Sequence, residues 1–291
     1  MKDPEEKEIL AYIAGLIDGD GHIGIRKIKD KNLPLIQFHN TSKQSCAYLN
    51  KLFGGTLAFD KPKKEGYRTV WKWMLQGKEG CMNFLDKVST FLVLKKDSAK
   101  KLVEFLSNPC DENNYYQDCK DLNLNRKTEQ FNFDNIERKT SDCSFFWAYI
   151  AGIMDTDGSF SIERSVRKPG NNRQKNDLIK FRPKIILTMV SDRSIKHILS
   201  NCEYGGLCTV KAKSALRGKA FRFSIQSRSE AIEFLKRCVP YLQIKAIQAV
   251  NILNFCRNYN PTNGLARVPE EEKEYRENCY KQIVMLNNMP S

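Results

Sequence analysis

The sequence predicts an α+β fold built from two tandem copies of one αββαββα unit. A ten-residue segment at Tyr12–Gly21 (YIAGLIDGDG) returns 137 positions later at Tyr149–Gly158 (YIAGIMDTDG). Further landmarks return in the same order, among them Leu52–Thr56 (LFGGT) and Glu203–Leu207 (EYGGL). Because this similarity keeps its order over about 100 residues, it indicates an internal duplication with a pseudo-twofold relation between the copies.

Each element of the unit follows from a local pattern. An apolar helix ends at an Asp-x-Asp-Gly sequence, and a strand with alternating apolar residues comes directly after it. A second strand, a helix, a Gly-Gly turn and another strand pair follow, and two helices close the unit. The expected first-copy bounds are 8–17, 22–28, 35–40, 44–53 and 67–75; the second apolar helix is expected over 145–154, and a last helix over 270–285.

The repeats predict two domains joined by a polar linker. The first repeat domain spans 1–107, the linker 108–142, and the second repeat domain with a C-terminal helix 143–291. The linker is dense in Asp, Asn, Lys and Arg, so at most short helices are expected there. Later landmarks lie 150 or 151 positions apart, which places an insertion in the second copy, most simply the polar loop 166–178.

Composition restricts the class of protein. The chain has 291 residues, with 48 Lys and Arg against 34 Asp and Glu, and a net charge of +14, which indicates a polyanionic partner. No apolar stretch approaches the roughly 20 residues of a membrane-spanning helix, and the acidic N-terminus is unlike a secretory signal. The ten cysteines occur singly, without a Cys-x-x-Cys pair. They are interpreted as reduced thiols of an intracellular protein that is not secreted.

The repeated segment contains small residues that allow two helices to approach closely. Ala-Gly pairs occur at 14–15 and 151–152, and small side chains let helix backbones come together. If the two helices pack at the pseudo-twofold, their C-terminal ends converge and bring Asp20 beside Asp157. Two adjacent carboxylates repel each other unless a cation lies between them. Hard cations such as Mg²⁺ use carboxylates together with substrate phosphate, which outlines a phosphodiester-cleaving site.

The paired motif and its flanking landmarks resemble the LAGLIDADG homing endonucleases of the monomeric two-repeat type, over nearly the whole chain. The resemblance implies two antiparallel sheets that form a DNA-binding saddle, with the motif helices at the domain interface. It implies metal ligands at Asp20 and Asp157, together with the carbonyls of Gly19 and Thr156. It also implies Mg²⁺ as cofactor, with Mn²⁺ able to substitute and Ca²⁺ supporting binding without cleavage.

Further site residues follow from matching positions in the two copies. Lys95 and Lys245 each follow an aromatic-Leu-x-aliphatic run, and the family has a basic residue near its active site. They are expected to orient water or to offset charge on the transition-state phosphate, although a single lysine of this kind is as often simply solvated. Ser42 and Asp192 fall where the family often has a solvent-orienting polar residue, with the second position uncertain by one. The earlier motif acids are assigned mainly to helix-end structure: Asp18 and Asp155.

Strand parity predicts which side chains face the target. A two-stranded ribbon fits the DNA major groove, and phosphate contacts supply most of the affinity. With Ile23, Ile25, Phe38 and Trp73 taken as core, the opposite face carries the candidate DNA-binding residues. They are Arg26, Gln37, His39, Arg68 and Lys72 in the first copy, and Ser161, Glu163, Lys184, Arg222 and Ser224 in the second.

The resemblance implies a site-specific double-strand DNA endonuclease that cuts across the minor groove of a long target and leaves 3′ overhangs. Because the two halves differ at many presumed contact positions, the target is expected to be asymmetric and the protein a monomer without an obligate protein partner. An RNA-binding intron maturase and a transcription regulator on the same fold are the alternatives. A descendant that no longer cleaves has no reason to keep both Asp20 and Asp157, which favours the nuclease. The expected location is an organelle (mitochondrion or chloroplast) or the prokaryotic cytoplasm.

Overall fold

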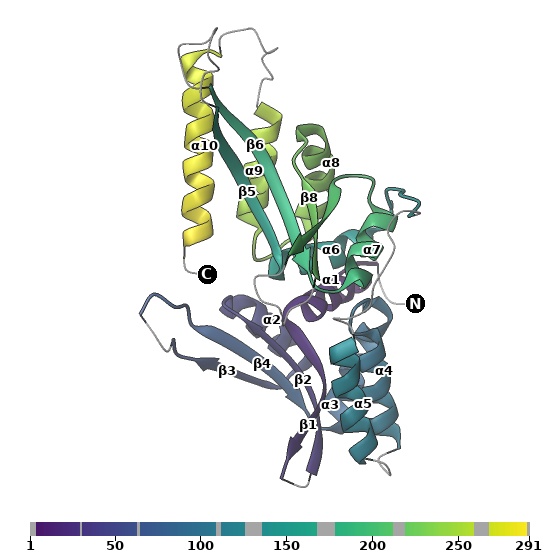
Figure 1. Cartoon of the computed structure of the whole chain (residues 1–291). Helices are drawn as coiled ribbons and strands as arrows, with labels where there is room; N and C mark the ends of the chain where they lie inside the picture. The colour runs from purple at the N-terminus through teal and green to yellow at the C-terminus, as the bar shows by residue number, and fades with distance from the viewer. Residues whose placement is uncertain are drawn as a thin grey trace.

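Two four-stranded antiparallel sheets, one from each repeat, form the framework of the protein (Figure 1). The strand orders are β1-β2-β4-β3 and β5-β6-β8-β7, so both sheets have one topology. The computed structural model describes residues 4–29, 31–62, 65–108, 112–125, 136–167, 178–211, 219–258 and 268–289. The predicted α+β fold with two αββαββα repeats is confirmed.

The first repeat contains every expected element. They are α1 (Pro4–Asp20), β1 (Gly21–Ile28), β2 (Lys31–Asn40), α2 (Lys43–Phe53), β3 (Thr56–Asp60), β4 (Val70–Gln76), α3 (Lys78–Val88), the 3₁₀ turn η1 (Ser89–Phe91) and α4 (Lys96–Ser107). Several predicted bounds were wrong. The motif helix spans Pro4–Asp20 rather than 8–17, β2 begins at Lys31 rather than at 35, and β4 begins at Val70 rather than at 67.

The second repeat follows the same order. Its elements are α6 (Ser144–Thr156), β5 (Gly158–Arg167), β6 (Leu178–Met189), α7 (Asp192–Asn201), β7 (Gly206–Lys211), β8 (Lys219–Ile225), α8 (Arg228–Cys238), η4 (Val239–Tyr241), α9 (Ala246–Asn258) and α10 (Glu270–Asn288). The predicted insertion loop falls mostly on 168–177, which lies outside the described residues.

The predicted linker contains a helix longer than expected. Helix α5 (Glu112–Asn125) spans 14 residues and packs against α4 and β1. The ring centroids of Phe105 and Tyr115 are 6.0 Å apart, and Lys101 forms an ion pair with Asp118 at 3.3 Å. Helix α10 packs in the same way against α9 and β5, and the two helices flank opposite sides of the molecule in Figure 1. The repeated unit therefore includes one more helix than the sequence pattern predicted.

The alternation of the strands was predicted correctly. Ile23, Ile25, Phe38 and Trp73 are all buried on the inner face of the first sheet. The second sheet buries its own inner row in the same manner: Phe160, Ile162, Ile185, Leu187 and Phe223. Burial of one such side chain contributes about 1.5–3 kcal/mol to stability.

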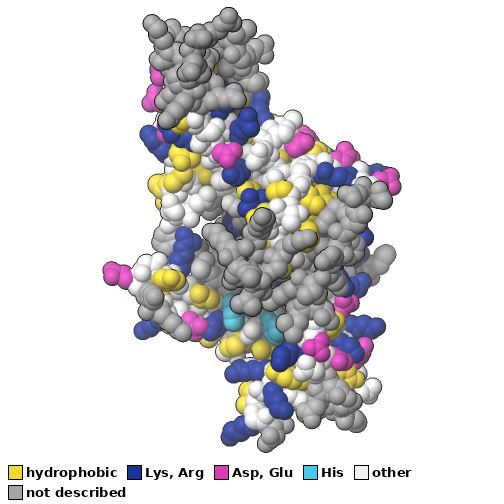
Figure 2. All heavy atoms as spheres, in the orientation of Figure 1, with side chains coloured by type: hydrophobic (Ala, Val, Ile, Leu, Met, Phe, Trp, Pro, Cys, Tyr) yellow, Lys and Arg dark blue, Asp and Glu magenta, His cyan; other side chains and the backbone are white. Residues whose placement is uncertain are grey.

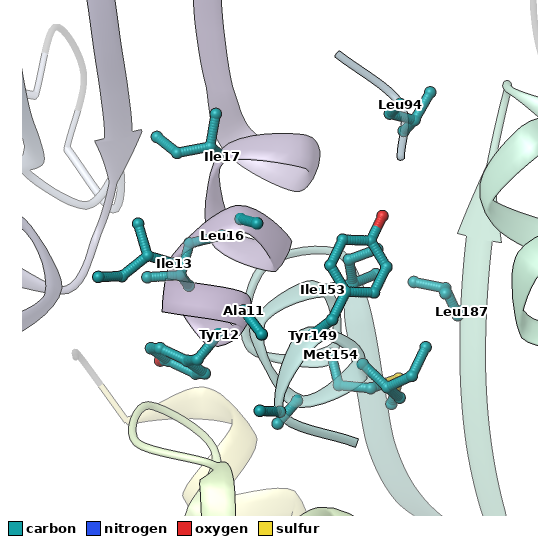
Figure 3. Close-up of a cluster of buried hydrophobic side chains, with 14 of the residues drawn as sticks. Ala11, Tyr12, Ile13, Leu16, Ile17, Leu94, Tyr149, Ile153, Met154 and Leu187 are labelled. Atoms are coloured by element: carbon teal, nitrogen blue, oxygen red, sulfur yellow. The ribbon is translucent and has the colours of Figure 1, made fainter. Parts of the chain in front are cut away.

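Helices α1 and α6 pack against each other at the centre of the molecule, and Ala11 of α1 and Tyr149 of α6 belong to one cluster of buried side chains (Figure 3). Their closest approach is at two glycines. A Cβ atom on Gly15 would lie 2.1 Å from the Tyr149 carbonyl oxygen, and one on Gly152 would lie 2.2 Å from the Tyr12 carbonyl oxygen. Because no side chain larger than hydrogen fits there, the predicted close packing of the motif helices is confirmed.

Among the residues that the structure describes, none of the helices combines the length and the apolar character needed to cross a bilayer.

Candidate active site

The first aspartate of each motif is buried at the interface between the two repeats, where it accepts hydrogen bonds from both of them. Asp18 is 2% exposed and Asp155 is 1% exposed. Each carboxylate accepts three backbone N–H bonds from a loop of its own repeat, which precedes α4 in the first repeat and α9 in the second. The donors to Asp18 are Val93 (2.7 Å), Leu94 (2.8 Å) and Lys95 (2.8 Å); those to Asp155 are Gln243 (2.8 Å), Ile244 (3.1 Å) and Lys245 (2.8 Å).

A fourth hydrogen bond to each aspartate comes from the opposite motif helix. The Tyr12 hydroxyl donates to Asp155 Oδ2 at 2.8 Å, and the Tyr149 hydroxyl donates to Asp18 Oδ2 at 2.9 Å. Burial, assisted by the aspartate charge, raises the pKa of both phenols, so they remain protonated donors. These aspartates are structural, as predicted. Sequence reasoning missed the tyrosines, although both stand at the first position of the repeated segment.

Two lysines donate hydrogen bonds to carbonyl oxygens at the C-terminal ends of the motif helices. Lys95 Nζ donates to the carbonyl oxygens of Ile17 and Asp18, each at 2.7 Å. Lys245 Nζ donates to those of Met154, Thr156 and Gly158, at 3.0, 2.9 and 2.7 Å. A cation at a helix C-terminus satisfies free carbonyls and interacts favourably with the helix dipole. Burial lowers the pKa of Lys245. Neither lysine is an ordinary solvated side chain, and their effect on water or phosphate stays a prediction.

The second aspartates of the motifs, Asp20 and Asp157, stand at the ends of these helices with exposed side chains. Surrounding protein, and secondarily the charge of Asp20, raises the pKa of Asp157 to about 6, while Lys95 and Lys245 oppose that rise. Partial burial also raises the pKa of Asp20, and a hydrogen bond from Asn40 opposes it. The Asn40 amide donates to Asp20 Oδ2 at 2.8 Å. The carboxylates therefore interact electrostatically, as the convergence of the helices predicts.

A cavity of about 500 Å³ opens beside Asp20. Both repeats and the end of α10 contribute to its wall, and Arg68 donates to the Asn287 carbonyl oxygen at 3.3 Å across it. His39 also lines the cavity, and its Nε2 atom is buried without a hydrogen-bond partner. Burial lowers the pKa of this imidazole, so its neutral form is favoured. The cavity is large enough for part of a substrate to reach Asp20.

The donor set next to the cavity suits a hard divalent cation. Within the described residues there is no cluster of three or more His, Cys, Asp or Glu that could enclose a metal. Asp20 and Asp157 instead supply two carboxylates in an open position, which fits Mg²⁺ because it keeps water ligands and binds substrate phosphate. The predicted carbonyl ligands already accept lysine hydrogen bonds: Gly19 from Lys95 at 3.4 Å and Thr156 from Lys245 at 2.9 Å.

Ser42 is a helix cap in this structure. Its Oγ accepts from the Ser45 backbone N–H at 3.4 Å and from the Ser45 hydroxyl at 3.0 Å, at the N-terminus of α2. The position equivalent to Ser42 is Ser191, the N-cap of α7, so the predicted match to Asp192 was displaced by one residue. The Asp192 side chain lies outside the described part of the chain. A role for Ser42 and Asp192 in orienting solvent stays a prediction.

The register places nine of the ten candidate DNA-binding residues on the outer faces of the sheets. His39 lies opposite Lys72, and Ser161 lies opposite Lys184. Arg68 is the exception, because it precedes β4 and lies in a loop. The others are Arg26, Gln37, Glu163, Arg222 and Ser224.

Several of these side chains are already paired with a neighbour. Lys72 forms an ion pair with Asp60, and Lys184 forms one with Glu163 at 2.8 Å. Figure 2 shows Lys and Arg side chains spread over one face of the molecule, with acidic side chains among them. Contact of any of these residues with DNA stays a prediction.

Solved structures share this fold over nearly the full chain. A mutant of I-SmaMI has a TM-score of 0.63 and 14% sequence identity, and the alignment covers 97% of both chains. I-LtrWI, described as a LAGLIDADG homing endonuclease bound to target DNA, has a TM-score of 0.63, 14% identity and 98% coverage of both chains. I-GzeII, in complex with its DNA target, has a TM-score of 0.62, 14% identity, and 97% coverage of this chain and 98% of its own.

The sequence itself matches no family model and no curated protein. At identities this low, the structural likeness establishes the fold. The function therefore depends on what the residues of this chain place at the site.

Proposed function

We propose that this chain, which has the fold of the LAGLIDADG homing endonucleases, is a site-specific double-strand DNA endonuclease. One observation carries the proposal: each repeat supplies one aspartate, Asp20 or Asp157, to the point where the two motif helices meet. The structures of I-LtrWI and I-GzeII contain the same fold with bound DNA. A net charge of +14 suits a long phosphate backbone as partner.

The residues at the site have two kinds of role, structural support and metal binding. Asp18 and Asp155 hold the motif helices to both repeats, and Lys95 and Lys245 hold the last helical turns. This rigid support positions the second aspartates to bind a divalent cation together with a scissile phosphate. Bound Mg²⁺ would activate water and neutralise charge on the leaving oxygen. Mn²⁺ is expected to replace it, whereas Ca²⁺ supports binding without cutting. I-SmaMI was determined with calcium ions and an uncleaved target.

The arrangement of two sheets around one aspartate pair limits the expected product. Because the acids come from opposite repeats, we expect each scissile phosphate to lie near the pair, across the minor groove, so that the two cuts are staggered. The resemblance to the LAGLIDADG homing endonucleases implies that the overhangs are 3′. Because the repeats differ at their outer strand positions, the target is asymmetric and one chain is sufficient. An intron maturase could use the same sheets, but the presence of both carboxylates favours DNA cleavage.

A plasmid-cutting assay tests the proposal. The substrate carries the sequences that flank the gene, joined without the gene. In Mg²⁺ the wild-type chain should linearise it, whereas Asp20→Asn or Asp157→Asn should lose most cutting of at least one strand. Specific binding in Ca²⁺, measured by gel shift, should survive in both variants. Asp86→Asn is the matched control, because it removes the same charge from an exposed position on α3. Full cutting by the double variant would refute the proposal.

A further inference from the structure

The two aspartates at the centre of the site have different neighbours. The Asn40 amide nitrogen donates to Asp20 Oδ2 at 2.8 Å, and its Oδ1 accepts the backbone N–H of Ser42 at 2.8 Å. Because Oδ1 already binds a backbone donor, the amide can turn only its NH₂ group toward Asp20. Both polar atoms of the Asn40 side chain are therefore hydrogen-bonded, and its NH₂ group holds one oxygen of the Asp20 carboxylate.

The second repeat has no such donor at the equivalent position. In β1 and β2, Gly21 pairs with Phe38, and in β5 and β6, Gly158 pairs with Leu187. Two residues after Phe38 comes Asn40, and two residues after Leu187 comes Met189. The N-caps of the next helices, Ser42 and Ser191, confirm this alignment.

The equivalent residue cannot replace the amide. Met189 is buried, and its thioether carries no hydrogen to donate. Among the described residues, no side chain donates a hydrogen bond to the Asp157 carboxylate, whose pKa responds to burial and to the charges of Asp20, Lys95 and Lys245.

The cavity shows the same asymmetry. His39 and Asn40 line it beside Asp20, and the counterpart of His39 in the second sheet is Thr188. Neither Thr188 nor Asp157 is among the residues that line it. This cavity thus borders Asp20 and not Asp157.

We propose that Asn40 is a positioning residue that holds Asp20 in one orientation, so that the phosphodiester bond served by Asp20 is cut before the bond served by Asp157. This inference rests on the proposed endonuclease function. A carboxylate oriented before the substrate arrives loses less freedom on reaching the reactive geometry. Asp157 has no such anchor and must be ordered at the moment of binding.

Exchanging the two side chains tests the order of cutting. The target duplex carries a different label on each strand, and the strand served by Asp20 is the one whose cutting Asp20→Asn slows more. The wild-type chain should nick that strand first. Asn40→Met should reduce the preference roughly tenfold, the order expected for one hydrogen bond to a charged group. The double exchange, Asn40→Met with Met189→Asn, should reverse the order.

Further variants distinguish a change in the order of strand cutting from a defect in folding. Asn40→Ser and Met189→Gln make smaller changes at the same positions. Asn50→Met is the matched control, because Asn50 lies on α2 and its side-chain amide donates to the Gly54 and Gly55 carbonyl oxygens, away from Asp20. It should lower stability without changing the strand preference. An unchanged order in a folded double exchange would overturn the inference, whereas a wild-type chain that cuts no duplex would refute the endonuclease function itself.

A second readout needs neither metal nor DNA. In ¹⁵N-labelled protein, the side-chain amide signal of Asn40 is identified by its loss in Asn40→Ser. That signal should move in Asp20→Asn, because its acceptor changes, and should stay in place in Asp157→Asn. A signal that does not respond to Asp20→Asn would show that the hydrogen bond is absent, and the inference would fail.

Discussion

The crossed tyrosine–aspartate bonds make a quantitative prediction about the interface between the repeats. Tyr12→Phe removes a hydroxyl that donates to buried Asp155, and Tyr149→Phe removes the donor to buried Asp18. Each aspartate keeps three backbone donors, so the charge remains partly satisfied. The loss should equal one hydrogen bond to a charged group, about 1.5–3 kcal/mol per variant. Because the aspartates are almost fully buried, water cannot replace the lost donor easily.

The assay is equilibrium unfolding in urea, with far-UV circular dichroism to verify the native fold. Tyr67→Phe is the matched control, because its side chain is 69% exposed and the change should stay within about 0.5 kcal/mol. The two interface variants should behave alike because their contacts are equivalent. A double-mutant cycle of Tyr149→Phe with Asp18→Asn isolates the coupling between that pair. If both interface variants unfolded like Tyr67→Phe, the crossed bonds would not stabilise the interface.

Further predictions concern the helix crossing, the lysines, the aspartates and the charge. Gly15→Ala places a methyl group against the Tyr149 carbonyl oxygen and should lower the free energy of unfolding by at least about 3 kcal/mol, the upper end of the usual range for single substitutions. A variant as stable as the wild-type chain would contradict this prediction. Lys245→Ala should slow cutting about 100-fold while gel-shift affinity is kept. Raising the pKa of Asp157 from 3.8 to about 6 means that stability falls as pH rises between those values, so metal-free Asp157→Asn should gain stability at pH 7. This rise in pKa corresponds to about 3 kcal/mol, and the expected gain in stability is about 1 kcal/mol because solvent screens the exposed side chain. Thermal unfolding of the wild-type chain and the variant at pH 4 and pH 7 measures the gain. Affinity for duplex should fall log-linearly with salt, and a flat response would exclude phosphate contacts as its source.

The sequence predicted the parts of the molecule that depend on local pattern. Alternation in the strands identified Ile23, Phe38 and Trp73 as core, because successive side chains of a strand point to opposite faces. The repeated Ala-Gly pair predicted where the helices cross, because small residues are required there. These signals lie within a few residues of one another and need no knowledge of distant contacts.

Helix α5 shows where such reasoning fails. Its segment is rich in Asn and Asp, and its apolar residues form only a narrow stripe that contains Tyr115, Cys119 and Leu122. Packing of Tyr115 against Phe105 and burial of Cys119 decide its structure. The helical periodicity of apolar residues is weak in this segment, because only one narrow face of α5 packs against the rest of the protein.

By itself, the sequence determined that two copies of one unit meet at paired helices and that each copy brings one carboxylate, Asp20 or Asp157, to the junction. Duplication and motif are properties of residue order. Only the tertiary structure decided what surrounds each carboxylate. Asn40 reaches Asp20 from a neighbouring strand, whereas Met189 occupies the equivalent strand position in the second repeat. The physical reason is that a hydrogen bond depends on which atoms face each other in space, and residues far apart in the chain are brought face to face only when the sheets and helices pack.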